Sequence, residues 1–136
     1  MSQEVIPIRV GEITLLSKHL VLIKHNFGES IRLQDVEEQI ECTRKLAKDN
    51  DYVVILDGGE VLDIEDDAMN LAARHVDDQW KAFALIIRSL SDRLFANYYL
   101  FFKKPVRPTQ AFTTLPGAEK WLKQYVPIDG TIDYNL

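Results

Sequence analysis

The 136-residue sequence contains one cysteine, Cys42, with only six glycines and five prolines. A single cysteine excludes an internal disulfide and a zinc site built from several cysteines, and it suits a reducing cytosol. With 46% hydrophobic and 27% charged residues, the low glycine and proline content is typical of a compact chain that buries a core. This length predicts one domain, over residues 1–126, followed by a tail at 127–136.

Basic residues are fewer than acidic ones: the sequence has 16 Lys and Arg and 21 Asp and Glu, which gives a net charge of −5. A phosphate backbone would meet net repulsion, so nucleic acid is not expected as a partner. No apolar run approaches the roughly 18 residues of a membrane span, and the N-terminus lacks the pattern of a secretory signal. We therefore expect a cytoplasmic protein without membrane insertion.

Apolar runs predict the strands. Residues 13–16 and 20–23 flank a polar trio, as in a β-hairpin, and an alternation over 6–10 adds a strand that Pro7 restricts to an edge or a strand start. The continuous runs at 52–56 and 82–87 are typical of strands covered on both faces, and a short strand is expected near 110–112.

Apolar residues three and four positions apart predict the helices, at 33–47, at 68–74, after the capping pair Ser89 and Asp92, and after Thr114. The third helix carries the stripe Leu90, Leu94, Tyr98 and Phe101. The order of elements predicts an α/β fold, with a mixed sheet of about four to five strands, parallel at its centre, and about four helices.

Two sets of apolar residues lead to packing predictions. The stripes and buried-type strands place Ile40, Ile55, Leu85, Trp121 and Leu122 in one core. The tail residues Ile128, Ile132, Tyr134 and Leu136 are expected to pack on the domain or on a second copy of it, and the alternative is a frayed terminus.

Six carboxylates lie between Asp57 and Asp67 with no basic residue among them. Two of them with His75 would supply the donors of a divalent metal site. Their spacing matches neither HExxH nor an EF-hand, and Gly58-Gly59 is not followed by the lysine of a phosphate-binding loop. We therefore expect no metal, no cofactor and no catalytic residue; the simpler interpretation is a solvated loop whose acids favour the start of the next helix.

Aromatic and basic residues alternate near the end of the third helix, in the segment 98–107. Such a mixture occurs on faces that bind single-stranded nucleic acid. The helical spacing of Tyr98 and Phe101 favours packing in the core instead.

The stretch from Val54 to Ala72 resembles the signature of STAS domains, the anti-sigma-factor antagonists similar to SpoIIAA. In that family a buried strand ending in Asp, here Asp57, leads to a loop of the form V-x-x-(I/M)-D-S-(S/T)-G-(L/M), and a helix begins at the serine. The counterpart here runs from Val61 to Met69. The ending with Phe112, Ala118 and the pair Trp121-Leu122 is similar to STAS/SEC14-like bacterial proteins, and the resemblance covers about residues 13–125.

The resemblance places Asp66 where the family has its phosphorylated serine, with Glu65 before it and Asp67 and Ala68 after it. No hydroxyl stands at these positions, and a carboxylate carries about one negative charge where a phosphate carries ~1.5 to 2. The phosphorylation switch is therefore expected to be lost or replaced, with Asp66 and Asp67 in the first turn of the helix.

The resemblance implies a non-enzymatic, regulatory module that binds another protein. The sequence leaves open whether the protein forms a homodimer. The expected contact residues are Asp57, Gly58, Glu60, Asp63, Glu65, Asp66, Asp67 and Met69. One alternative is a SEC14-like carrier of a small molecule or lipid, with a pocket lined by Leu94, Tyr98, Phe101 and Phe102. A second alternative is an enzyme that uses the acidic cluster with a metal.

Overall fold

The computed structural model describes residues 4–130, 132 and 134. Its strands are β1 Val5–Ile8, β2 Gly11–Ser17, β3 Leu20–His25, β4 Ser30–Ile31, β5 Tyr52–Asp57, β6 Asp63–Ile64, β7 Trp80–Ile86 and β8 Thr109–Phe112. Its helices are α1 Leu33–Ala47, α2 Asp66–Arg74, α3 Leu90–Tyr98 and α4 Leu115–Leu122, and a π-helical turn, η1 Tyr99–Lys103, continues α3.

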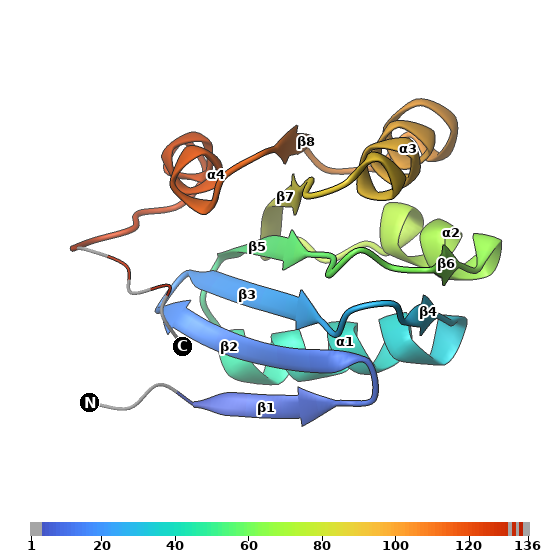
Figure 1. The fold of residues 1–136 in the computed structure, drawn as a ribbon. Coiled ribbons are helices and arrows are strands. Elements are labelled where there is room, and N and C mark those ends of the chain that lie inside the picture. The colour runs from blue at the N-terminus through green and yellow to red at the C-terminus, as the bar shows by residue number, and fades with distance from the viewer. Residues whose placement is uncertain (1–3, 131, 133, 135–136) are drawn as a thin grey trace.

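Six strands form a mixed sheet in the order β1-β2-β3-β5-β7-β8 (Figure 1). The first three pair antiparallel, whereas β3, β5, β7 and β8 run parallel, which confirms the α/β prediction. The sheet has more strands than the four to five expected from the sequence. The sixth strand is β1, which was expected over residues 6–10; it lies at the sheet edge, as Pro7 requires.

The sheet is covered on both faces, so the protein has two apolar cores. Successive side chains of a strand point to opposite faces, and Val54 therefore packs with α1, α2 and α3 while Ile55 packs with α4. The prediction of one core was wrong for this reason. Ile55, Trp121 and Leu122 lie on the α4 face, and Leu85 lies on the other.

The tail packs on the α4 face. Ile128 is buried there, and Ile132 and Tyr134 contact the same core. The Tyr134 hydroxyl also donates to Glu119 Oε1 at 2.5 Å. These contacts confirm that the tail packs on its own domain; Leu136 lies outside the described residues.

Helix α3 begins where the sequence predicts but buries a different stripe. Ser89 Oγ accepts from the Asp92 backbone N–H at 3.1 Å, which confirms the cap. The buried residues are Asp92, Ala96 and Tyr99, spaced as one helical face. The predicted core stripe is wrong, since its larger side chains are exposed: Leu90, Leu94, Tyr98 and Phe101.

The acidic segment after β5 is more ordered than the predicted loop. Strands β4 and β6 pair in parallel, Ser30 with Asp63 and Ile31 with Ile64, and hold this segment against the start of α1. Helix α2 then begins at Asp66. Asp66 and Asp67 therefore occupy its first turn, as predicted. Within the described residues, no helix has the length and apolar character that crossing a membrane requires.

Candidate functional site

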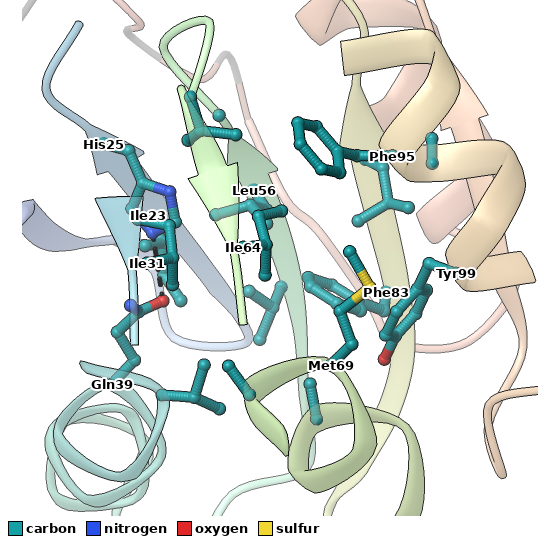
Figure 2. Close-up of a pocket in the computed structure, with 18 of the residues that line it drawn as sticks. Ile23, His25, Ile31, Gln39, Leu56, Ile64, Met69, Phe83, Phe95 and Tyr99 are labelled. Carbon is teal, nitrogen blue, oxygen red and sulfur yellow. Dashed lines mark hydrogen bonds between the residues drawn. The ribbon is translucent and has the colours of Figure 1, made fainter. Parts of the chain in front are cut away.

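A pocket of about 140 Å³ lies between the sheet and the three helices on its face, α1, α2 and α3. The sheet supplies the floor through Ile23, Val54, Phe83 and Leu85. Figure 2 shows Met69 of α2 and Phe95 and Tyr99 of the α3 region around the same space. The walls are mostly apolar and aromatic, which is the usual lining of a small-molecule site.

Part of the lining with access to solvent lies near the carboxyl end of β5. The lining residues Leu56, Gly58, Ile64 and Phe95 are partly exposed there, whereas the sheet floor is buried. In open α/β sheets this edge, at the carboxyl ends of parallel strands, is where ligands bind.

Four buried polar atoms of the lining have no hydrogen-bond partner within the described part of the chain. They are His25 Nδ1, Gln39 Nε2, Thr43 Oγ1 and Tyr99 OH. Gln39, Thr43 and Tyr99 are only 7%, 4% and 7% exposed. A buried polar group without a partner costs about 1–3 kcal/mol, and the same deficit occurs away from the pocket at Ser17 Oγ, His75 Nε2 and Arg107 Nε.

Gln39 and His25 are linked on one side of the pocket, across from Tyr99 (Figure 2). Gln39 Oε1 lies 3.2 Å from His25 Nε2. Burial lowers the pKa of His25, and the hydrogen bond with Gln39 only partly offsets this. The imidazole is therefore neutral at pH 7. With Oε1 as acceptor, Nε2 carries the ring proton and Nδ1 is left as an acceptor.

Charged side chains at the mouth serve the fold. Asp57 ends β5 and accepts two hydrogen bonds from Arg88, from Nε and Nη2 at 2.9 Å each. Asp92 lines the pocket and accepts from the Arg88 backbone N–H at 3.0 Å. Gly59 has φ +61°, and a Cβ there would lie 2.3 Å from the His25 carbonyl oxygen, so this close turn requires glycine.

The residues predicted to bind a partner do not form one surface. Asp57 and Met69 are buried, and Gly58 and Met69 line the pocket. Glu60 is partly exposed, with φ +55° in the turn after Gly59. The four exposed members flank the start of α2: Asp63, Glu65, Asp66 and Asp67.

Asp66 is held by the end of the α3 region. Lys103 Nζ lies 2.5 Å from Asp66 Oδ1, and the Tyr98 hydroxyl donates to the same oxygen at 3.3 Å. The hydrogen bond from Lys103 lowers the pKa of Asp66. The carboxylate at the family's phosphoserine position is thus paired within the molecule.

The residues predicted to line a ligand pocket lie outside it. Leu94, Tyr98, Phe101 and Phe102 are between 41% and 72% exposed, and none lines the pocket. That prediction was wrong because the larger apolar side chains of α3 face solvent. Together with Leu90, these residues form what we call the α3–η1 surface, on which Tyr98 and Phe102 stack at 5.1 Å.

Sequence reasoning missed the polar atoms of the pocket, His25, Gln39, Thr43 and Tyr99. One signal was present in α1, where Asp35, Gln39 and Thr43 stand four residues apart on the buried face of the helix. Within residues 4–130, 132 and 134, no group of three or more His, Cys, Asp or Glu side chains is placed to hold a metal ion.

Comparisons with known proteins agree with this fold. No curated protein matches the chain. A similar solved structure is an uncharacterized protein of the DUF3478 family with a SpoIIAA-like fold, from Shewanella loihica PV-4. The two share 14% identity over 89% of this chain and 92% of that one, with a TM-score of 0.55, and such a likeness shows the fold alone. The fold implied by the STAS resemblance is thereby confirmed. Residues 14–126 match the family described as Domain of unknown function (DUF7793), and the chain therefore belongs to that family.

Proposed function

We propose that the protein is a binding module for a small, largely apolar molecule, which it holds between the sheet and helices α1, α2 and α3. The observation that carries this proposal is the pocket of about 140 Å³. It is similar in size to an engineered core cavity of about 150 Å³ that binds benzene.

The free-energy cost of the empty pocket supports a ligand. A closed cavity lowers the free energy of unfolding by about 24 cal/mol per Å³. A closed cavity of this volume would therefore cost about 3 kcal/mol, and the opening to solvent makes the cost smaller. A ligand that fills the pocket recovers contacts with Phe83, Phe95 and Tyr99, since aromatic side chains offer large apolar areas.

Filling the pocket with a side chain tests the proposal. Ala96 lies on α3, is buried and lines the pocket. Ala96→Leu should raise the free energy of unfolding by about 1–2 kcal/mol, because the added carbons enter open space. The same variant should abolish the binding of toluene and p-cresol that calorimetric titration detects with the native chain.

Ala118→Leu is the matched control, because Ala118 is fully buried between α4 and the other face of the sheet. Overpacking there should cost about 1–3 kcal/mol. If Ala96→Leu destabilises as much as Ala118→Leu, and neither compound binds the native chain, the proposal fails.

A second candidate function is the regulatory protein-interaction module implied by the STAS resemblance. One observation favours it: the exposed acids at the start of α2 adjoin the α3–η1 surface, through Lys103 and Tyr98 on Asp66. Exposed apolar side chains gathered beside charged ones are typical of interaction sites.

Substitution on the α3–η1 surface tests this second candidate. Phe101→Ser with Phe102→Ser should abolish the capture of a partner by the native chain from its own cell extract while leaving p-cresol binding intact, because neither residue lines the pocket. Equal capture by the native chain and the variant would contradict it. With Asp66 in place of the serine, bacterial anti-sigma kinases and ATP should add no phosphate near the start of α2, as mass spectrometry would report.

A further inference from the structure

We infer that the part of the ligand held in the pocket is a small hydrocarbon, without a hydroxyl, carboxylate or amine group, because the surface that the pocket presents to it is almost entirely carbon. This inference rests on the proposed function and specifies the chemistry of its ligand.

The apolar lining comes from all the elements around the pocket. Figure 2 shows Met69 of α2, Phe83 of β7 and Phe95 of α3 gathered around the same space. Aromatic side chains pack favourably against a second ring. By comparison with the cavity that binds benzene, the volume holds about six to ten non-hydrogen atoms. A single aromatic ring with a short alkyl substituent fits both the volume and the lining.

Two of the polar side chains in the lining use their polar atoms within the protein. The Tyr52 hydroxyl donates to Asp77 at 2.6 Å, and Trp80 Nε1 donates to the Ala82 carbonyl oxygen at 3.1 Å. Because these donors are already occupied, what Tyr52 and Trp80 offer to a ligand is the carbon of their rings.

The polar atoms of the lining that have no partner are out of reach of a ligand. Neighbouring atoms cover His25 Nδ1, Gln39 Nε2, Thr43 Oγ1 and Tyr99 OH, and Figure 2 shows the Gln39 amide nitrogen turned away from the pocket. A ligand hydroxyl would therefore lose its hydration on entering the pocket without gaining a hydrogen bond from these atoms.

Asp92 makes the pocket unsuitable for ions of either sign. An anion would meet its carboxylate, and the described lining residues include no lysine or arginine that would compensate. Asp92 is 7% exposed, and its Oδ2 already accepts from the Arg88 backbone N–H at 3.0 Å. A cation would exchange its hydration for a pair with this buried carboxylate, and the desolvation cost of a buried ion pair can exceed the attraction.

Comparing toluene with p-cresol isolates the hydroxyl, since the two molecules differ by that group alone. Calorimetric titration of the native chain should give toluene an affinity about tenfold higher than that of p-cresol, because the hydroxyl loses its hydration without a partner. p-Cresol should still bind, because its ring fills the same space. 4-Methylbenzoate and 4-methylbenzylamine should not bind at concentrations where toluene saturates.

Adding a hydroxyl to the pocket wall should weaken the discrimination. Val54→Thr on the floor and Ala96→Ser on α3 should each lower the preference for toluene about three- to tenfold, because p-cresol then gains a hydrogen-bond partner. Val53→Thr is the matched control. It makes the same change at the neighbouring buried residue of β5, which packs on the α4 face, so the preference should not change.

Equal affinity of the native chain for toluene and p-cresol would overturn the inference and leave the proposed function standing. Tighter binding of p-cresol or of either charged compound than of toluene would do the same. A toluene preference that neither Val54→Thr nor Ala96→Ser lowers, or that Val53→Thr lowers equally, would also overturn it. If neither toluene nor p-cresol binds the native chain, the proposed function itself fails.

Discussion

Asp57 shows how a buried carboxylate from a signature motif serves the fold. It ends β5, and its carboxylate is paired with the half-exposed guanidinium of Arg88, which follows β7. This pair ties the ends of two neighbouring parallel strands together beside the pocket mouth. A role in stability explains this aspartate without a partner protein.

Asp57→Asn should lower the free energy of unfolding by about 1–3 kcal/mol, because two charge-assisted hydrogen bonds are weakened. Glu41→Gln is the control, since it removes an exposed ion pair with Lys45 on α1 and should cost under ~0.5 kcal/mol. Urea denaturation measures both, and equal losses would show that the Asp57 pair contributes no more than a surface pair.

His25 predicts a pH dependence in the mildly acidic range. Burial lowers the pKa of His25 in the folded chain below the ordinary value of about 6.5. As the pH falls, His25 therefore binds a proton in the unfolded chain before it does so in the folded chain. The free energy of unfolding is largest above about pH 6.5 and decreases as the pH falls from there to the lower pKa of the folded chain. Burial also lowers the pKa of His75, which acts in the same direction.

His25→Gln should reduce the fall in the free energy of unfolding between pH 7 and pH 5, as measured by urea denaturation at several pH values. Glutamine keeps an N–H donor for Gln39 but does not titrate. Asp35 and Asp77 have lowered pKa values and ordinary values of 3.8, so their contributions change at lower pH. An unchanged fall in the variant would contradict the buried, neutral state of His25.

At the scale of elements, α3 shows where periodicity misleads. The sequence predicted a buried stripe from its largest apolar residues, yet the structure buries Asp92, Ala96 and Tyr99 instead. The buried face is small and partly polar because it borders a pocket and carries a capping carboxylate. The capping pair Ser89 and Asp92 placed the start of the helix correctly, but hydrophobic spacing could not identify which of its two faces packs inward.

Strand β5 was predicted more successfully. Its run of β-branched residues is typical of a strand covered on both sides, and β5 indeed lies between β3 and β7 with packing on both faces. The two-residue strands β4 and β6 were missed, because a segment of that length carries no periodicity.

Ile55→Ala should cost about 2–5 kcal/mol, because Ile55 is fully buried on the α4 face. Leu94→Ala should cost under ~0.5 kcal/mol, because Leu94 is exposed. Chemical denaturation of Leu94→Ala, with Ile55→Ala as the buried reference, therefore checks that Leu94 lies on the exposed face of α3. A large loss for Leu94→Ala would show that the α3–η1 surface is packed inside.

At the scale of the whole molecule, some residues predicted for the partner surface belong to the pocket, and residues predicted for the pocket lie on the surface. Met69 and Gly58, predicted to contact a partner, line the pocket, whereas Tyr98, predicted to line a pocket, lies outside and contacts Asp66. Sequence patterns predicted the class and order of elements because these depend on local runs of residues. The pocket depends on how three helices meet one face of the sheet, and no local pattern carries that information.

The central claim, a ligand pocket on one face of the sheet, is tested most directly by methyl NMR spectra of the native chain titrated with p-cresol. The two faces of the same strands provide an internal control. The methyl signals of Ile23, Val54 and Leu85 on the pocket floor should shift and saturate together. Those of Leu20, Leu22 and Ile55 on the α4 face should stay in place. Shifts confined to the exposed Leu90 and Leu94, or equal shifts on both faces, would contradict the claim.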